Sequence, residues 1–135
     1  EAAAWYARQG MTLGNAIDAL YREYGFYSCT QKSFTFAGET GMEKMAALMQ
    51  SLRRAPLHEI AGLPVEGYTD YAADRTGLPK ANVLEYRLPG GDKVIIRPSG
   101  TEPKIKAYLT AVTADAETAA AQLEKLATAA ARLLA

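Results

Sequence analysis

Apolar residues recur at two different spacings along this chain, and each spacing predicts a type of element. In 93–97 and 105–111, every second residue is apolar or small. A period of two places alternate side chains on one face of a strand. We therefore predict two strands, with Val94 and Ile96 on one face and Arg97 on the other. The segment RPSGTEP (97–103) is the predicted loop between them, and Arg97 opens it.

Three other strands are predicted from less regular patterns. Residues 26–36 are interpreted as a linker and first strand. Residues 58–71 are broken by glycines and a proline, so we expect an irregular or edge strand and then a loop through Pro79. Residues 82–88 alternate cleanly, and the inward side chains should be Leu84, Tyr86 and Leu88. Residues 89–92 (PGGD) make the turn into the strand at 93–97.

Helical spacing of apolar residues predicts four helices. The chain opens with EAAAWYARQG, which ends at Gly10, and Thr12 is expected to cap a second helix that Gly25 closes. Thr40 and Glu43 have the spacing of a capping box. The helix that follows ends near Arg54, and its predicted apolar stripe is Met42, Met45, Met49 and Leu52.

The last helix should run from about 115 to 134, with a stripe of Ala116, Ala119, Leu123, Leu126, Ala130 and Leu133. After the two short N-terminal helices, the element order is β-α-β-β-β-β-α. Helices segregated from a mostly antiparallel sheet are typical of an α+β, two-layer domain.

Composition restricts the function classes. The chain has 135 residues, a formal net charge of zero and 49% apolar residues, which argues against a disordered or generally nucleic-acid-binding protein. No apolar run has membrane-spanning length and no signal peptide is visible, so no membrane partner is expected. Cys29 is the single cysteine, which rules out an internal disulfide and fits a reducing cytoplasm.

The residue types of the loop suit an anion. Arg97 offers a planar fork for two phosphate oxygens, and Ser99 and Thr101 offer hydroxyl donors. Gly100 would let the backbone approach closely, in a nest of amides that needs alternating backbone handedness. The alternative is an ordinary hairpin turn, since proline, serine and glycine are common turn residues. From 87 to 106 there are five basic residues against Asp92 and Glu102, which favours the anion site.

RPSGTEPKIKAY resembles the phosphate-binding loop in the last domain of the α-D-phosphohexomutases, which move a phosphate between C1 and C6 of glucose or mannose. ETGMEKMAALMQSLR and LPKANVLEYRL resemble the longer phosphoglucomutase or phosphomannomutase type more than the phosphoglucosamine mutases. The similarity covers nearly the whole chain, as about the C-terminal quarter of such an enzyme. It implies the same element order, in the fold shared with TATA-box-binding-like proteins.

The resemblance also implies functional assignments. Arg97, Ser99, Gly100 and Thr101, with Lys104, would hold the non-reacting phosphate of a phosphosugar substrate while a phosphoserine elsewhere exchanges with the other end. Residues 1–27 would be the helical tail of the preceding sugar-binding domain and a hinge, and 28–135 the phosphate-binding domain. The missing N-terminal domains would be its partners. The full-length enzyme would use Mg2+ and a hexose 1,6-bisphosphate intermediate, whereas this stretch binds no cofactor.

Several expected motifs are missing from the sequence. There is no phosphoserine loop of the TASHNP kind and no DGDxDR magnesium loop, so we expect the chain alone to be inactive. His58, the only histidine, is a poor metal ligand without a second one nearby. Asp70, Asp74 and Arg75 are interpreted as a solvated loop.

Two other function classes stay open. A non-catalytic module that binds phosphorylated ligands would have the same loop, but we would expect a capped N-terminus rather than Glu1 in mid-helix. A nucleic-acid-binding domain would need a basic stripe with stacking aromatics, and only Tyr108, beside Lys104 and Lys106, fits that description. We therefore expect no nucleic-acid partner. By the resemblance, Trp5, Tyr6 and Tyr21 are interpreted as former core residues of the preceding sugar-binding domain rather than a ligand site.

Overall fold

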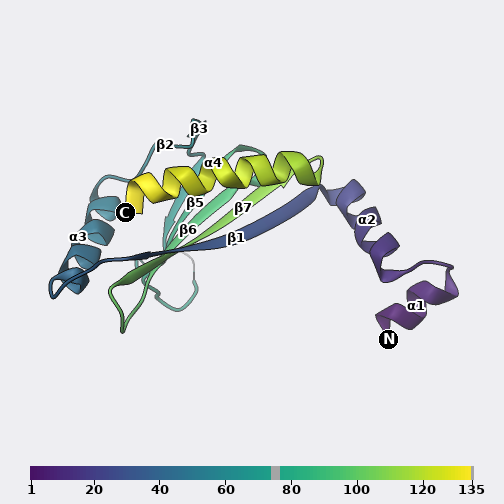
Figure 1. The fold of residues 1–135 in the computed structure, drawn as a ribbon, viewed down its shortest axis with the longest axis horizontal. Helices are drawn as coiled ribbons and strands as arrows, with labels where there is room; N and C mark the ends of the chain where they lie inside the picture. The colour runs from purple at the N-terminus through teal and green to yellow at the C-terminus, as the bar shows by residue number, and fades with distance from the viewer. Residues whose placement is uncertain (74–76, 135) are drawn as a thin grey trace.

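The computed structural model describes residues 1–73 and 77–134 and contains a two-layer α+β domain with a helical arm (Figure 1). The main sheet has five strands in the order β1-β7-β6-β5-β4, and every neighbouring pair is antiparallel. Its strands are β1 (Phe26–Thr35), β4 (Gly67–Asp70), β5 (Leu84–Arg87), β6 (Lys93–Pro98) and β7 (Lys104–Thr113). With α3 (Gly41–Arg54) after β1 and α4 (Ala116–Leu134) after β7, the main-sheet order β-α-β-β-β-β-α is confirmed.

Both helices of the domain cover the same side of the sheet. α4 lies across it, and α3 packs near one end (Figure 1). The inward positions of β5, β6 and β7 are buried as the alternation predicts: Leu84, Tyr86, Leu88, Val94, Ile96, Ile105, Ala107, Leu109 and Ala111. The opposite face has no helix on it and is called here the helix-free face. It carries Arg97, Lys104 and Lys106.

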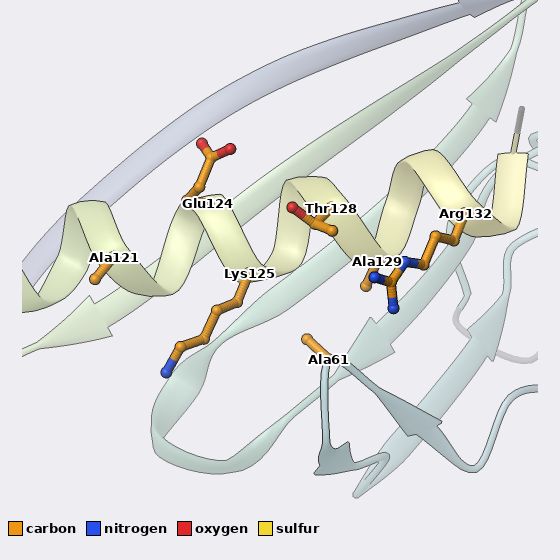
Figure 2. Close-up of a pocket in the computed structure, with 7 residues that line it drawn as sticks. All are labelled: Ala61, Ala121, Glu124, Lys125, Thr128, Ala129 and Arg132. Atoms are coloured by element: carbon orange, nitrogen blue, oxygen red, sulfur yellow. The ribbon is translucent and has the colours of Figure 1, made fainter.

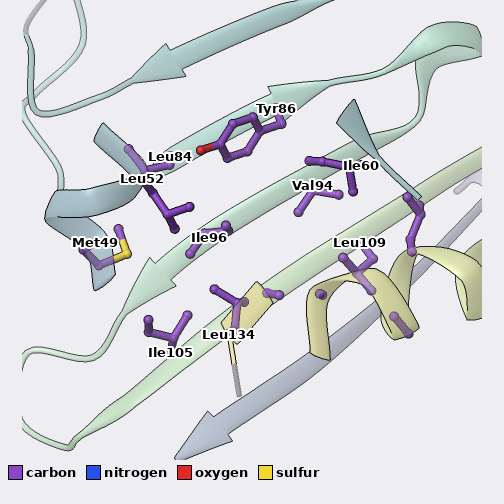
Figure 3. Packing of buried hydrophobic residues seen from close by; sticks show 14 of the residues in the cluster. Met49, Leu52, Ile60, Leu84, Tyr86, Val94, Ile96, Ile105, Leu109 and Leu134 are labelled. Carbon is purple, nitrogen blue, oxygen red and sulfur yellow. The ribbon is translucent and has the colours of Figure 1, made fainter. Parts of the chain in front are cut away.

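The core joins this sheet face to α3, α4 and a small hairpin (Figure 3). Met45, Met49 and Leu52 enter it from α3, and Leu126, Ala127, Ala130 and Leu134 enter it from α4. Tyr86 is fully buried, and its hydroxyl approaches the backbone of Leu57 without a hydrogen bond of good geometry. Burial, with a smaller effect of Tyr68, raises the pKa of Tyr86 to about 12.

The segment at 58–71 is more ordered than the sequence indicates. It forms a hairpin of β2 (Glu59–Ile60) and β3 (Leu63–Pro64), and then β4, which pairs with β5 at the sheet edge. Ala61 at the hairpin turn has a φ of 55° and packs against the core cluster. The expectation that Asp70 lies in a solvated loop is wrong, because it ends β4 and accepts a hydrogen bond from Arg53 at 3.1 Å.

The two N-terminal helices project away from the sheet as an arm (Figure 1). These are α1 (Ala2–Arg8) and α2 (Leu13–Tyr24). Thr12 caps α2 as predicted, since its hydroxyl accepts from the Asn15 amide at 3.1 Å. Gly25 closes α2 with a φ of 90°. Apolar side chains of the arm stay exposed, namely Trp5, Leu13, Ile17, Leu20 and Tyr24.

Two helix predictions are wrong in detail. Thr40 precedes α3, but its side chain caps no amide, because its ψ of 9° is not the extended conformation typical of an N-cap. Met42, predicted to belong to the buried stripe of α3, lies in the first turn of the helix and is 41% exposed. Similarly, Ala116 at the start of α4 is exposed.

Candidate functional site

The predicted phosphate loop lies at the tip of the hairpin formed by β6 and β7. Arg97 lies opposite Lys106 and Pro98 opposite Ile105, so residues 99–103 connect the two strands. The Ser99 amide donates to the Lys104 carbonyl at 2.8 Å, which closes the loop at its base. A loop between adjacent antiparallel strands therefore holds the residues selected from the sequence.

Ser99 organises the turn from within. Its Oγ accepts hydrogen bonds from the amides of Thr101 at 3.3 Å and Glu102 at 3.2 Å. The hydroxyl hydrogen of Ser99 is then free to donate to a ligand. These two amides already have an acceptor inside the protein, so they are not available to the amide nest that the sequence predicts.

Gly100 differs from the expectation in its backbone conformation. It is not among the glycines with a positive φ, so the alternating handedness of an amide nest is not present here. A Cβ added at Gly100 would meet no atom within 4 Å. The backbone conformation of the turn thus does not require a glycine. A glycine would be needed here only to leave space for a molecule that binds to the loop.

Lys104 is engaged with the loop's own carboxylate. Its Nζ lies 2.6 Å from Oε2 of Glu102. This hydrogen bond and the charge of Lys104 lower the pKa of Glu102, and the charge of Lys106 adds a smaller effect in the same direction. This pairing leaves less of the Lys104 charge for a ligand.

The neighbouring helix supports the loop from the side. The Phe36 amide donates to the Pro103 carbonyl at 2.8 Å. Gly41, the first residue of α3, lies so close to this point that an added Cβ would come within 2.8 Å of the Cβ of Pro103. The loop end, the end of β1 and the start of α3 therefore pack together.

A buried carboxylate on the helix-free face was missed by sequence reasoning. Glu85 is only 8% exposed and lies 3.1 Å from Arg87 and 3.9 Å from Lys93, while the Tyr71 hydroxyl donates to it at 3.1 Å. Its only sequence signal is its outward position in the alternating strand 82–88. The single charge of Glu85 balances one of the two positive charges of Arg87 and Lys93, which weakens the basic patch available to an anion.

The other polar candidates do not gather into a site. Within residues 1–73 and 77–134, no three histidine, cysteine or acidic side chains come together in a way that could hold a metal ion. His58 lies just before β2, and Asp74 and Arg75 lie outside the described residues. Tyr108 lies on the helix-free face with Lys106, and its register partners are Ile95 on β6 and Gln31 on β1.

Among residues 1–73 and 77–134, none of the helices has the length and apolar character needed to span a membrane.

A hollow of about 540 Å3 lies on the other side of the sheet, between α4 and the β2–β3 turn (Figure 2). Figure 2 shows Ala61 pointing toward α4, with Lys125 and Arg132 at the borders of the hollow. None of the predicted phosphate-binding residues lines this hollow, so it is a different feature from the loop at 97–104.

Comparisons with known proteins agree with this fold and identify a family. The family model described as phosphoglucomutase/phosphomannomutase, C-terminal domain, matches residues 43–129. A phosphoglucomutase of Staphylococcus haemolyticus is 39% identical over 76% of this chain and 20% of its own length. A probable phosphomannomutase of Haemophilus influenzae is 38% identical over 77% of this chain and 20% of its own length.

The fold is also found among solved structures. The exocytosis-sensitive phosphoprotein pp63/parafusin, a phosphoglucomutase from Paramecium in its open form, superposes with a TM-score of 0.58 at 16% identity. The match covers 90% of this chain and 23% of parafusin. This chain thus spans about a fifth of the curated relatives that it matches. By its family match and its fold, it belongs to the phosphoglucomutase/phosphomannomutase C-terminal domain family.

Proposed function

We propose that this chain is the substrate-phosphate-binding domain of an enzyme that interconverts hexose 1-phosphate and hexose 6-phosphate. The observation that carries the proposal is the loop at 97–104. In a chain of this family, it combines an exposed Arg97 that makes no ion pair within the described residues with a turn ordered by Ser99. A guanidinium and hydroxyl donors at one hairpin tip suit a phosphate monoester.

Each loop residue has a proposed role. Arg97 provides the bidentate fork, and Ser99 and Thr101 donate their hydroxyl hydrogens. Gly100 leaves space for a phosphate oxygen near the backbone, which agrees with the open space around its α-carbon. Lys104 contributes positive charge, which Glu102 partly neutralises. A set that contacts only phosphate would accept a bisphosphate intermediate in either orientation.

The rest of the enzyme supplies what this chain lacks. We assign residues 1–27 to the tail of a preceding sugar-binding domain and a hinge, and 28–135 to the phosphate-binding domain. The hinge is placed at Gly25, between α2 and β1. Closure about that hinge would shield phosphoryl transfer from water. The described residues offer no acidic cluster for the magnesium ion of the family, so the metal and the phosphoserine belong to the other domains in this proposal.

An NMR titration tests the binding role. Three to five such hydrogen bonds, each about 1.5–3 kcal/mol gross, must offset several kcal/mol of lost ligand freedom, so we expect affinity of about millimolar. Glucose 1-phosphate and inorganic phosphate should shift amides in 97–104, whereas glucose should not. The Arg97→Ala variant should lose these shifts. If no amide moves at the highest soluble ligand concentration, this loop does not bind phosphate in the isolated chain and the proposal fails.

A separate assay tests catalysis. The purified chain should not convert glucose 1-phosphate to glucose 6-phosphate, because it has no serine loop for the phosphoryl group. Activity that copurifies with the chain and disappears in Arg97→Ala would contradict this expectation, since a contaminating mutase would not respond to that substitution.

A further inference from the structure

β1 forms an open edge of the main sheet. Its ten residues pair with β7 along one side, and among residues 1–73 and 77–134 no strand pairs with its other side. An exposed edge strand presents a row of unpaired N–H and C=O groups, which is a template for pairing with another chain. Because β1 is longer than a typical strand, this row is long as well.

Alternate residues of β1 direct their backbone groups to the open edge. Just beyond the strand, the Phe36 amide donates to the Pro103 carbonyl, and hydrogen-bonded pairs recur at every second residue of an antiparallel ladder. The even-numbered residues of β1 therefore bond to β7. The outward-facing backbone groups belong to residues whose side chains are exposed on the helix-free face, namely Tyr27, Cys29, Gln31, Ser33 and Thr35.

β1 has few of the features that normally protect an edge. Natural edge strands are blunted by prolines, β-bulges and charged side chains. β1 contains no proline, its register with β7 is continuous from Phe26 to Thr35, and Lys32 is its single charged residue. A partner strand must therefore place a neutral residue opposite Lys32.

We propose that the partner is a second copy of this chain, whose β1 pairs antiparallel with the first about a two-fold axis beside Thr30. Pairing of even-numbered residues with each other keeps the helix-covered faces of both sheets on one side. In this register Thr30 lies opposite its own copy, and Phe26 lies opposite Phe34 of the second copy. Lys32 lies opposite Ser28, so no like charges face each other. Thr–Thr and aromatic pairs of this kind stabilise antiparallel strands.

The flank of α4 suits this pairing. α4 contacts both β7 and β1 on the helix-covered face. Its flank toward the β2–β3 turn carries Ala129 and Arg132, which line the hollow together with Ala61. About half a helical turn around the axis from Ala129 lie Ala120 and Ala131, which are both exposed. Two α4 helices can therefore approach each other over the joined sheets through small side chains.

Amide exchange measured by NMR at two chain concentrations tests this inference. We would compare about 50 µM with about 1 mM, since a small interface should associate weakly. The amides of Tyr27, Cys29, Gln31 and Ser33 should be protected only at the higher concentration, whereas the amides that bond to β7 should be protected at both. Sedimentation should show a monomer that converts to a dimer over this range. A monomer at about 1 mM, or a dimer with unprotected outward amides, would contradict the proposal.

Gln31→Pro removes one outward N–H without touching the bonds to β7. Proline is tolerated on an edge strand whose N–H faces solvent, so the variant should keep the circular dichroism spectrum of the chain. Dimerisation should weaken at least about 10-fold. Gln31→Ala is the matched control, because it also removes the side chain but keeps the N–H, and it should dimerise like the unmodified chain. Equal dimerisation of the two variants would show that the edge is not the interface.

A disulfide test fixes the register and needs no loss of stability. In a Cys29→Ser background, Thr30→Cys places a thiol opposite its own copy, with a Cα–Cα separation of about 4.5 Å that a disulfide can span. With oxidised glutathione, this variant should form a covalent dimer. Ser28→Cys in the same background faces Lys32 instead and should crosslink far more slowly. Equal crosslinking of the two variants would mean random collision and would refute the register.

The exposed apolar side chains of α2 offer another route to self-association. Ile17→Lys places a charge on that surface and should leave dimerisation unchanged. If Ile17→Lys abolishes the dimer while Gln31→Pro retains it, the arm is the interface and the proposal for β1 fails. The inference is independent of the phosphate role of the loop, because Gln31→Pro should keep the phosphate-dependent shifts at 97–104 whether or not the chain dimerises.

Discussion

At the scale of the residue, Gly100 and Gly62 illustrate two different reasons why a loop position can require a glycine. A glycine can be required by a left-handed backbone or by the approach of a ligand. Gly62 in the β2–β3 turn is of the first kind, with a φ of 80° and no atom within 4 Å of an added Cβ. Gly100 has the same open surroundings without the positive φ. We therefore expect position 100 to require a glycine only because a ligand approaches the backbone there.

This difference gives a prediction for Gly100→Ala. The free energy of unfolding should rise by about 0.4–1 kcal/mol, because alanine restricts the unfolded chain at a position that it can occupy without strain. Affinity for glucose 1-phosphate should nevertheless fall, by at least about threefold, if the phosphate approaches the backbone there. Urea unfolding and NMR titration measure the two effects.

Gly62→Ala is the control, and it should show the reverse. It should lower stability by roughly 1–2 kcal/mol because of its left-handed backbone, and it should leave binding unchanged. Unchanged binding in Gly100→Ala would remove Gly100 from the phosphate site.

At the scale of the element, the loop at 99–103 packs against the start of α3. Gly41 packs against Pro103 and the carbonyl of Phe36, so the helix, the edge strand and the loop share one contact. A side chain at position 41 cannot be accommodated by a flexible neighbour, because the atoms it would meet belong to the backbone and to a proline ring.

We accordingly expect Gly41→Ala to lower the free energy of unfolding by about 1–3 kcal/mol, as overpacking does in a close contact. It should also weaken phosphate binding, because Pro103 is the last residue before Lys104. Gly14→Ala in α2 is the comparison, since its added Cβ meets only the Thr12 hydroxyl at 3.6 Å. Equal stabilities of the two variants, measured by chemical denaturation, would show that the contact at Gly41 is not tight.

The elements were predictable where one local pattern decides them. Two-residue alternation predicted β5, β6 and β7 with the correct inward faces, because each has one buried face and one helix-free face. The capping box at Thr40 failed because capping depends on backbone angles that spacing does not specify. The irregular or edge strand predicted within 58–71 is present as β4 at the sheet edge, but its bounds were not predictable, because glycine and proline obscure a short edge strand and pairing with β5 defines it.

The position of the loop was predictable from the sequence, and the contacts around it were less so. The residue types at 97–103 predicted a loop between two strands, and β6 and β7 flank it in the structure, whereas its phosphate-binding role stays a prediction. The facing of Arg97 and Lys106 follows from a register counted outward from the turn, but the pairing of the other three cations does not. Glu85 pairs with both Arg87 and Lys93 through contacts that the sequence pattern leaves unspecified.

At the scale of the whole molecule, the arm and the sheet domain are nearly independent. No member of the core cluster comes from residues 1–25. The described contacts of α2 with β1 include the stacking of Tyr21 on Phe26, with ring centroids 4.3 Å apart. The exposed apolar side chains of α2 therefore contribute little to the stability of the sheet.

Removal of residues 1–24 should consequently leave a folded domain. We expect its Tm to lie within a few degrees of that of the full chain, since about 1 kcal/mol shifts Tm by roughly 4–8 °C in a domain of this size. Phosphate-dependent shifts in 97–104 should persist. Circular dichroism and NMR of the shortened chain test this. Loss of cooperative unfolding would mean that the arm is part of the folding unit and would contradict the proposed boundary near residue 27.

The placement of the loop in one hairpin has a consequence for protein engineering. Arg97, the turn and Lys106 lie within a single contiguous stretch, and the strand register alone brings its two ends together. A site encoded in this way can be transplanted as one segment. If the loop binds phosphate as proposed, residues 93–106 should give a modest preference for phosphate esters to another antiparallel sheet that has one solvated face, the same register and a small residue beside the proline of the loop.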